Sequence, residues 1–536
     1  MSSSGPTLKK AKQGEVVLRF APEPSGYLHV GHAKAALLNE YFKEKYDGRL
    51  LLRFDDTNPA KENDDFVQSI LSDLKTLKVE HEPVTWASDF FDELLELTYE
   101  WIDSGKAYAD DTPTEKMREE RLTRTDSKCR ENTPEQNREM FEQMKRGEIR
   151  AVIRAKWDMT CNNGCMRDPV LWRVNTEDKH HRLTEEQWPY LMFPTYDFSC
   201  PIIDAWQGIT HALRSAEYTD REELYYRILV EAGIPKDKMP SVYVFSRMNL
   251  QYTILSKRYL RQFVFEGFVE SWWDPRMPTI RGLIRRGLTV DALKEFVLIA
   301  GASKAGNLQE WGHLWNINKK VIDPTSRRFI AVPAEDVVEV DISGAPLTTK
   351  TADYFKKNPA LGEKTFVIAP KVLLSQEDAS TIENGEKVTM MNLGNCVVDQ
   401  ILTSGAKVTK ILMTYLPEDM DFKGTKKLSW VPDQSVEGQP QEHADVECVY
   451  FDHLITKPSM DEGDIPTEFM RPNSRVAVKF VGDYSMLVDG AITQGSTIQI
   501  ERVGYFYVDA VEGNYIRLHG IPDGKTKASG ALGNKQ

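Results

Sequence analysis

The segment VVLRFAPEPSGYLHVGHAKAALLNEYF, residues 16–42, decides the fold of the first part of the chain. An apolar run typical of a strand leads into a turn rich in proline, and a helical pattern begins at the tetrapeptide HVGH. His29 and His32 are therefore expected one turn apart at a helix N-terminus, where free backbone N–H groups and the helix dipole favour anions. Gly31 lacks a Cβ, so a flat ligand can approach its backbone closely. The segment predicts a site for a nucleoside triphosphate, and the alternative is two histidines on a solvated first turn.

A second short motif, ILSKR at residues 254–258, follows the apolar stretch VYVFSRMNL. A loop that contains Ser256, Lys257 and Arg258 can reach phosphate groups with a mobile ammonium. Taken alone, the motif is better explained as a basic surface loop, and it gains weight only beside the HVGH segment.

The composition indicates a soluble protein of several domains. With 536 residues, of which 41% are hydrophobic and 28% are charged, the chain is long enough for three or four domains. No apolar run is long enough to span a bilayer, and the lysine-containing N-terminus lacks the apolar segment of a secretory signal. Six cysteines in a chain of this length are typical of a reducing compartment. We therefore expect a cytoplasmic protein without a membrane partner.

The charge distribution is uneven. A net charge of −13 argues against a general nucleic-acid-binding protein, but phosphate binding requires only a local positive potential. Between Lys257 and Arg286 the chain has seven Lys or Arg residues against three acidic ones. This region predicts contact with a nucleic-acid backbone, and a solvated helix face is the alternative.

Hydrophobic periodicity divides the chain into regions. Alternating strand and helix patterns favour a parallel sheet with crossover helices, and the missing G-x-G-x-x-G argues against a dinucleotide site. An insertion that begins with a charged helical stretch interrupts this alternation, and short runs between turn residues later predict an all-β sandwich or barrel region. The expected regions are a flexible tail at 1–14, the first half of the α/β domain at 15–107, the insertion at 108–205 with its helical stretch at 114–146, the second half at 206–250, a helical region at 251–328, the all-β region at 329–522 and a flexible tail at 523–536.

Several long blocks, in order, resemble the glutamyl-tRNA synthetases, which are class I aminoacyl-tRNA synthetases, in their eukaryotic and archaeal form. These blocks are RFAPEPSGYLHVGHAKAALLN, LLRFDDTNPAKE, PTYDFSCPIIDAWQGITHALRSAEYTDR, ILSKRYL and MPTIRGLIRRG. The resemblance implies a multidomain α/β and all-β fold. Its parts are a split Rossmann-like catalytic domain, an inserted domain that binds the acceptor end of tRNA, a helical stem-contact region and two anticodon-binding β-barrels.

The activity implied by the resemblance is glutamate–tRNA ligation. ATP activates L-glutamate to glutamyl-adenylate, and the glutamyl group then passes to the terminal adenosine of tRNA(Glu). Mg²⁺ is expected to accompany ATP, held by phosphates and water, with no metal site on the protein. Ile254 and Leu255 replace the first lysine and the methionine of the family's KMSKS signature, which leaves one lysine in this loop. The implied catalytic residues are His29, His32 and Lys257, and the implied ATP site adds Gly31, Ser256 and Arg258.

The implied glutamate pocket must pair two carboxylates and one ammonium. Arginines suit the carboxylates and Asp55 suits the ammonium. Arg214 decides the substrate, because the related glutaminyl-tRNA synthetases usually have Cys there, and His where this chain has Cys200. The neutral side-chain amide of glutamine would leave this arginine as a buried cation without an anionic partner, which is costly. Glutamate is therefore favoured over glutamine as the substrate. The implied pocket residues are Arg19, Ala21, Glu23, Asp55, Tyr196, Cys200 and Arg214.

Simpler structural roles are the alternatives for several of these residues. Arg19 could cap a sheet edge, Tyr196 could be a core residue, and Asp55 could cap a helix. Contacts with the tRNA backbone are expected at Arg276, Arg281, Arg285 and Arg286. Cys161 and Cys165, with His180 and His181 further on, leave a zinc site open, although an ordinary loop with thiols is the favoured interpretation.

Two other functions stay open. A glutaminyl-tRNA synthetase is opposed by Arg214 and Cys200, and a catalytically silent tRNA-binding protein is opposed by the complete set of histidines, arginines and Lys257. We expect a monomer. Relatives often carry an N-terminal module for partner binding, and whether this sequence is truncated or naturally lacks that module stays open, as does assembly with other synthetases.

Overall fold

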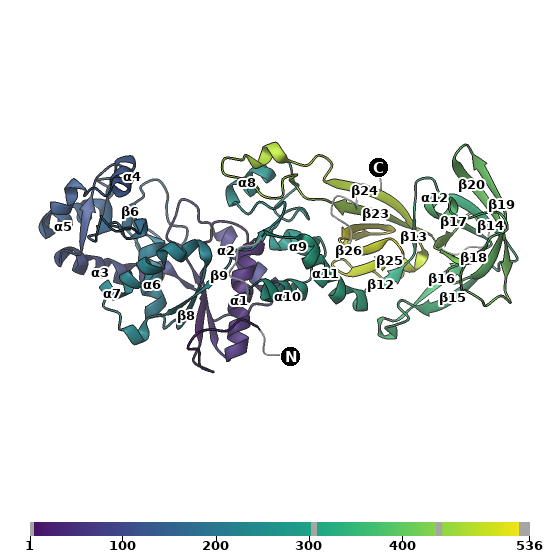
Figure 1. The fold of residues 1–536 in the computed structure, drawn as a ribbon, viewed down its shortest axis with the longest axis horizontal. Helices are drawn as coiled ribbons and strands as arrows, with labels where there is room; N and C mark the ends of the chain where they lie inside the picture. The colour runs from purple at the N-terminus through teal and green to yellow at the C-terminus, as the bar shows by residue number, and fades with distance from the viewer. Residues whose placement is uncertain (1–4, 302–307, 436–441, 525–536) are drawn as a thin grey trace. The chain divides into compact units, whose positions relative to one another are not determined.

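The computed structural model describes residues 5–301, 308–435 and 442–524 (Figure 1). The chain divides into two compact units, which we describe separately: residues 1–249 with 297–307, and residues 250–296 with 308–536. Of the flexible tails expected at 1–14 and 523–536, residues 1–4 and 525–536 lie outside the described residues. Within the described part of the chain, no helix is long and apolar enough to span a membrane.

The first unit contains the expected parallel sheet elements. One parallel sheet has the order β1-β2-β3 and a second pairs β8 with β9 in parallel. The hydroxyl of Thr210, directly before β8, accepts a hydrogen bond from the backbone N–H of Val17 at 2.9 Å, so β8 begins beside β1. These elements are β1 (Val17–Phe20), α1 (Val30–Tyr46), β2 (Arg49–Phe54), α2 (Asp64–Thr76), β3 (Thr85–Trp86), β8 (His211–Ser215), α7 (Glu222–Glu231) and β9 (Ser241–Phe245).

The insertion forms an antiparallel sheet with the order β4-β5-β6-β7. Its elements are α3 (Phe91–Asp103), which precedes it, then β4 (Ala107–Asp110), α4 (Thr114–Thr123), α5 (Pro134–Lys145), β5 (Val152–Ala155), β6 (Val170–Val174), β7 (Met192–Pro194) and α6 (Tyr196–Trp206). The helical stretch expected at 114–146 forms two helices, α4 and α5, with a break between them. Arg124 ends α4 in the left-handed conformation (φ 61°), and α5 begins at Pro134, which suits a first helical position.

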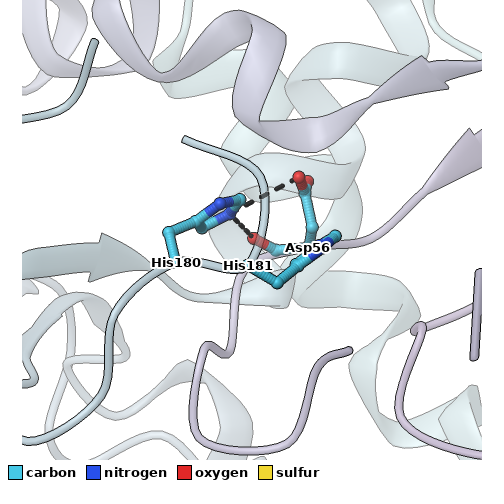
Figure 2. A group of neighbouring side chains, drawn as sticks. All are labelled: Asp56, His180 and His181. Carbon is cyan, nitrogen blue, oxygen red and sulfur yellow. Dashed lines mark hydrogen bonds and ion pairs between the residues drawn. The ribbon is translucent and has the colours of Figure 1, made fainter. Parts of the chain in front are cut away.

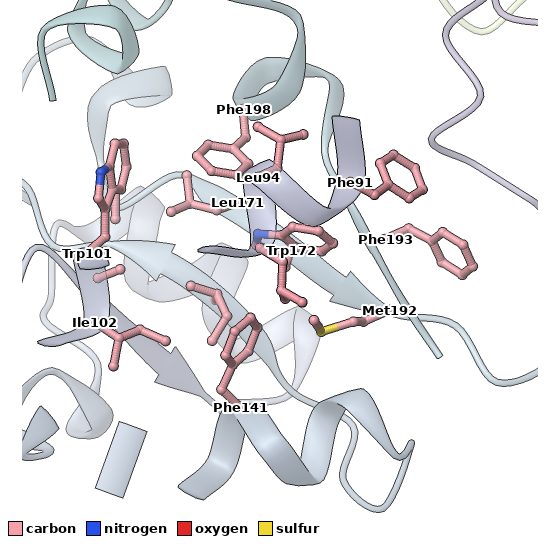
Figure 3. Close-up of a cluster of buried hydrophobic side chains, with 14 of the residues drawn as sticks. Phe91, Leu94, Trp101, Ile102, Phe141, Leu171, Trp172, Met192, Phe193 and Phe198 are labelled. Atoms are coloured by element: carbon pink, nitrogen blue, oxygen red, sulfur yellow. The ribbon is translucent and has the colours of Figure 1, made fainter. Parts of the chain in front are cut away.

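The core of the insertion is rich in aromatic residues (Figure 3). Phe91 and Trp101 of α3, Phe141 of α5, Trp172 of β6 and Phe198 of α6 are all nearly fully buried. The indole N–H of Trp172 donates to the Thr98 hydroxyl at 2.7 Å, so the polar edge of this buried ring is satisfied. This core attaches α6, which carries several expected pocket residues, to the insertion.

The N-terminal segment differs from the flexible tail expected at 1–14. Leu8 is buried, and its backbone N–H donates to the Tyr46 hydroxyl at 3.0 Å. The carbonyl oxygen of Lys9 lies 2.9 Å from Nε2 of His211, and the N–H of Gly14 donates to the carbonyl of Tyr46 at 2.8 Å. Residues 5–14 are therefore held against α1 and β8 by one apolar anchor and paired backbone groups.

The second unit begins with helices and continues with β-strands, as expected. Its helices are α8 (Lys257–Phe265), α9 (Ile280–Arg285), α11 (Trp311–Ile322) and the short α12 (Gln376–Ala379), while α10 (Val290–Gly301) extends from the second unit into the first. Two short strands, β10 (Asn249–Leu250) and β11 (Leu308–Gln309), also occur near the change of unit.

The all-β region contains two seven-stranded sheets, each with its own buried cluster (Figure 1). Their orders are β21-β18-β19-β20-β14-β17-β22 and β12-β25-β26-β27-β23-β24-β13, and β15 pairs separately with β16. The strands are β12 (Arg327–Phe329), β13 (Ala331–Pro333), β14 (Val338–Ser343), β15 (Thr348–Asp353), β16 (Glu363–Ile368), β17 (Lys371–Leu374), β18 (Lys387–Met390), β19 (Gly394–Ser404), β20 (Lys407–Leu416), β21 (Lys426–Leu428), β22 (Trp430–Pro432), β23 (Ala444–Phe451), β24 (Arg475–Gly482), β25 (Thr497–Ile500), β26 (Gly504–Glu512) and β27 (Tyr515–Ile521).

Candidate active site

The HVGH turn forms the N-terminus of α1, as the sequence predicts. His29 is the N-cap, and its Nδ1 accepts the backbone N–H of Gly31 at 3.1 Å. Nδ1 of His32 accepts the backbone N–H of His29 at 3.2 Å, and the two ring centroids lie 3.8 Å apart. Because both Nδ1 atoms act as acceptors in the helix cap, Nε2 is the ring nitrogen of each histidine whose N–H is of the kind that donates to phosphate oxygens.

Arg19, Tyr196, Cys200 and Arg214 come together in the first unit. Arg19 is the third residue of β1 and is almost fully buried, and its Nη2 lies 3.9 Å from Sγ of Cys200 on α6. Burial would lower the pKa of Arg19, but the nearby Asp204 carboxylate outweighs it and raises that pKa. Burial raises the pKa of Tyr196 and of Cys200, so both keep their protons.

Arg214 is an unusual buried cation. It lies on β8 with 6% of its surface exposed, and its guanidinium lies 5.1 Å from the ring centroid of Tyr218 and 5.0 Å from that of Tyr225. Its Nε and Nη1 are buried and have no hydrogen-bond partner among the residues that the structure describes. Unpaired donors of a buried cation are costly, so an anionic ligand at this position would stabilise the pocket.

Asp55 lies directly after β2, beside the turn that follows β1. Its backbone N–H donates to the carbonyl of Pro22 at 3.0 Å, and Thr57 donates a hydroxyl hydrogen bond to Oδ1 at 3.0 Å. Burial raises the pKa of Asp55 to about 7 despite the opposing effects of Thr57 and Arg53. In the same turn Ala21 is half-buried, and Glu23 accepts the Ser25 hydroxyl at 2.7 Å.

Sequence reasoning missed three residues of this region, namely Arg53, Asp204 and Tyr225. All three are nearly fully buried. Arg53 donates to Asp204 at 2.7 Å, and Tyr225 donates to it at 2.9 Å. An acidic residue within the apolar helix α6 is the one sequence signal that could have pointed to Asp204.

The ILSKR motif lies in the second unit, where Ser256 is the N-cap of α8 and Lys257 is its first residue. The Arg258 guanidinium lies 5.5 Å from the Tyr259 ring centroid. The histidines belong to the first unit, so the structure describes each half of the expected ATP site by itself.

The four arginines expected at tRNA do not form one exposed cluster. Nη2 of Arg276 lies 2.7 Å from Asp274, and Arg285 pairs with Asp509. Arg286 is 6% exposed, donates to the carbonyl of Phe451 at 2.8 Å, and has a pKa lowered to about 10 by burial. The half-buried Arg281 lies 5.8 Å from the Trp273 ring centroid. Three of the four thus make contacts within the chain that hold the helical segment and its β-sheet.

The histidines at 180–181 lie beside Asp56 rather than beside the cysteines (Figure 2). Nε2 of His180 lies 2.9 Å from the Asp56 carbonyl oxygen and 3.4 Å from its carboxylate, and burial lowers the pKa of His180. The same carboxylate accepts the backbone N–H and the hydroxyl of Ser88 and lies 3.7 Å from Nε of Arg182. Because Ser88 donates to the Asp56 carboxylate and the Arg182 cation lies beside it, we interpret these contacts as structural. They hold the loop that contains His180 and His181. Among the described residues, neither cysteine of the C-x3-C pair belongs to a group of three potential metal ligands.

A groove of about 660 Å³ lies in the first unit, beside the antiparallel sheet of the insertion. Its lining includes Asn58, which follows β2, and Arg150 and Arg173 of the insertion. Acidic side chains line it as well, among them Asp111 and Asp178.

Comparisons with known proteins agree with these features. The chain matches the family models described as tRNA synthetases class I (E and Q), catalytic domain, over residues 15–324, and anti-codon binding domain, over residues 326–416 and 427–509. The cytoplasmic glutamate–tRNA ligase of Arabidopsis thaliana is 43% identical over 527 residues, which cover 97% of this chain and 71% of that protein. The probable cytoplasmic glutamate–tRNA ligase of Schizosaccharomyces pombe is 42% identical over 535 residues, covering 98% and 72%. The bifunctional glutamate/proline–tRNA ligase of Mus musculus is 41% identical over 546 residues, covering 99% of this chain and 35% of that protein.

Proposed function

The chain belongs to the class I tRNA synthetases for glutamate and glutamine, and we propose that within this family it is a glutamate–tRNA ligase. The observation that carries the choice of glutamate is Arg214, a buried cation with two nitrogens that lack partners among the described residues. The similarity to glutamate–tRNA ligases over nearly the whole chain supports the same choice. The relatives are named cytoplasmic, and we extend this location to the chain.

The proposed reaction has two steps. The α-carboxylate of glutamate attacks the α-phosphorus of ATP, the bond to the bridging oxygen of pyrophosphate breaks, and glutamyl-adenylate forms. A hydroxyl of the terminal adenosine of tRNA then attacks the acyl carbon, and AMP leaves. Neither step needs a protein nucleophile, because positioning and stabilisation of phosphate charge carry the catalysis. The Nε2–H groups of His29 and His32 would donate to phosphate oxygens, and the Lys257 ammonium would follow the β- and γ-phosphates.

Mg²⁺ is expected to arrive with ATP. The HVGH turn presents imidazoles and backbone N–H groups, which are donors for anions and not the hard oxygen ligands that Mg²⁺ prefers. The ion therefore fits this site only through ATP phosphates and water, where it would neutralise phosphate charge.

The pocket residues divide the charges of glutamate between them. Arg214 would pair with the side-chain carboxylate, and Arg19 would pair with the other carboxylate, with the Tyr196 hydroxyl beside it. Ionised Asp55 would hold the α-ammonium. Glutamine would leave Arg214 opposite a neutral amide, and the lost charged hydrogen bond costs about 1.5–3 kcal/mol.

The second unit supplies the proposed binding surface for tRNA(Glu). Residues 326–416 and 427–509 match the anticodon-binding models, so we assign the two seven-stranded sheets to the anticodon. Within the basic region from Lys257 to Arg286, we assign Arg281, whose guanidinium lies 5.8 Å from the ring centroid of Trp273, to the tRNA backbone. The groove of the insertion is the proposed place for the acceptor end. We propose that the chain acts as a monomer.

Exchange of radioactive pyrophosphate into ATP tests the proposal, with the purified chain, tRNA and either glutamate or glutamine. We expect glutamate-dependent exchange and charging of tRNA(Glu). A chain that exchanged only with glutamine would be a glutaminyl-tRNA synthetase. A chain that bound tRNA but exchanged with neither amino acid would be a silent binding protein.

A further inference from the structure

Asp204 is the centre of a buried network that the sequence did not reveal. Its side chain has no solvent exposure. Nε of Arg19 donates to its two oxygens at 3.0 and 3.1 Å, Nη2 of Arg53 donates at 2.7 Å, and the Tyr225 hydroxyl donates at 2.9 Å. Three side chains from β1, β2 and α7 thus converge on one carboxylate of α6.

The network carries an excess of positive charge. Burial would raise the pKa of Asp204, but Arg19 and Arg53 outweigh it and hold this pKa below its usual range, so the carboxylate stays ionised. One negative charge therefore faces the two arginines that it binds, and Arg214 adds a third buried cation. A ligand with two carboxylates would offset this excess, whereas a neutral side chain would not.

Asp204 also determines which edge of Arg19 remains for a ligand. The carboxylate takes the Nε edge, and the carbonyl of Leu213 accepts from Nη1 at 3.1 Å. The remaining nitrogen, Nη2, has a weak contact at 3.9 Å with Sγ of Cys200. Cys200 lies one turn after Tyr196 on α6, so Nη2 faces the helix that carries the expected pocket residues.

Tyr225 connects Asp204 to the second pocket arginine. Its hydroxyl donates to Asp204, and its ring centroid lies 5.0 Å from the Arg214 guanidinium. The ring therefore supports Arg214 by a cation–π contact while its polar end is held by the carboxylate. Arg53 holds the other side of the network, since its Nη1 donates to Gln207 at 2.8 Å and Gln207 donates to Thr85 at 3.0 Å.

We propose that Asp204 is the positioning residue of the glutamate pocket. It orients Arg19 directly and Arg214 through Tyr225, and it sets the pocket charge to match a dicarboxylate. This inference rests on the proposed glutamate–tRNA ligase function. Asp204 itself does not touch the substrate in this assignment, because its oxygens are occupied by the two arginines and the tyrosine.

Three substitutions in the full chain test the inference: Asp204→Asn, Tyr225→Phe and, as a matched control, Asp168→Asn. Asp168 is also a fully buried aspartate that binds an arginine, Arg130, and accepts a tyrosine hydroxyl, that of Tyr108 at 2.8 Å, but it lies in the insertion. Glutamate KM, ATP KM and kcat are measured by pyrophosphate exchange in the presence of tRNA, and folding is measured by thermal unfolding.

We expect Asp204→Asn to raise the glutamate KM at least about tenfold, as expected for a lost charged hydrogen bond, and to leave the ATP KM unchanged. Tyr225→Phe removes a neutral donor and should raise the glutamate KM roughly threefold. Asp168→Asn should lower thermal stability and leave the glutamate KM at its wild-type value.

A folded Asp204→Asn protein with a wild-type glutamate KM would overturn the inference, as would an equal rise in the Asp168→Asn control. If Asp204→Asn does not fold, the Tyr225→Phe variant tests the inference instead. An unchanged glutamate KM in that variant would overturn the proposed connection between Asp204 and Arg214. Failure of the proposed function would appear separately, as a wild-type chain without glutamate-dependent exchange.

Discussion

Arg285 of α9 and Asp509 of β26 form a two-point ion pair, with Nε and Nη2 lying 2.5 and 2.8 Å from the two carboxylate oxygens. The residues are 224 positions apart in the chain, and the Asp509 side chain is 7% exposed. This pair joins the helical segment to the second seven-stranded sheet, so an arginine that looked suited to RNA contributes to the packing of the unit.

Replacing Arg285 with Ala should destabilise the second unit. Asp509 would lose its partner while buried, which costs about 1–3 kcal/mol. Thermal unfolding of Arg285→Ala, Asp509→Ala and the double variant measures the coupling between the two residues. Burial would raise the pKa of Asp509, but Arg285 holds it below its usual value. The stabilisation is therefore present at neutral pH and lost as the pH falls through this lowered pKa. Additive effects of the two substitutions would contradict the prediction.

Charge reversal at Arg281 should weaken tRNA binding. Removal of one phosphate contact lowers the slope of log K against log salt concentration by about one. Titrations of tRNA at several salt concentrations measure this slope, with ATP affinity as the control. An Arg281→Glu chain with the wild-type slope would exclude this residue from the tRNA surface.

Arg214→Cys should reduce the preference for glutamate. A buried carboxylate of the substrate loses its charged partner, so the ratio of kcat/KM for glutamate over glutamine should fall by roughly tenfold or more. Use of glutamine need not appear, because Cys200 also shapes the pocket. Pyrophosphate exchange with both amino acids gives the ratio, and a variant that kept the wild-type ratio would remove Arg214 from the choice of substrate.

The pKa of about 7 at Asp55 predicts a rising limb in the pH profile of kcat/KM for glutamate. The ionised carboxylate binds the α-ammonium, so kcat/KM for glutamate should rise with pH up to about 7 and then level off. Asp55→Asn should lower kcat/KM and abolish this limb. The matching profile for ATP is the control, and a limb that survived in Asp55→Asn would assign the titration to another group.

Lys257→Ala should slow the formation of glutamyl-adenylate. A positioned cation opposite developing phosphate charge contributes about 3 kcal/mol or more, which corresponds to about a hundredfold in rate. Single-turnover activation measures the effect, and tRNA affinity should change little. Unchanged activation would place Lys257 outside the ATP site.

The sequence predicted those features that depend on neighbouring residues. The strand, turn and helix of residues 16–42 formed as expected, with His29 as the N-cap of α1. The apolar runs of the all-β region became strands, such as β20 and β24. The break between α4 and α5 was missed because the charged stretch has helical composition on both sides of it. Residues 5–14 were missed because the contacts of Leu8 lie far away in the chain.

The candidate site was predictable only where a residue carries its own chemical signal. The histidines at a helix start and the lysine of the ILSKR loop could be named from residue type and place, whereas the arginines of the pocket were named from the family resemblance. The contacts that Arg276, Arg285 and Arg286 make within the chain could not be predicted, because nothing near these residues in the sequence indicates how firmly the fold holds each of them.

Local sequence thus determined the order of helices and strands and the chemistry available at the turn after β1, because periodicity and capping act over a few residues. Tertiary structure alone decided which charges meet. Arg19 and Asp204 are 185 residues apart, yet they lie within hydrogen-bonding distance because β1 and α6 pack in one unit. Burial then makes each charge depend on its partner, so the same residue type has two buried nitrogens without a described hydrogen-bond partner at Arg214 and forms an internal ion pair at Arg285.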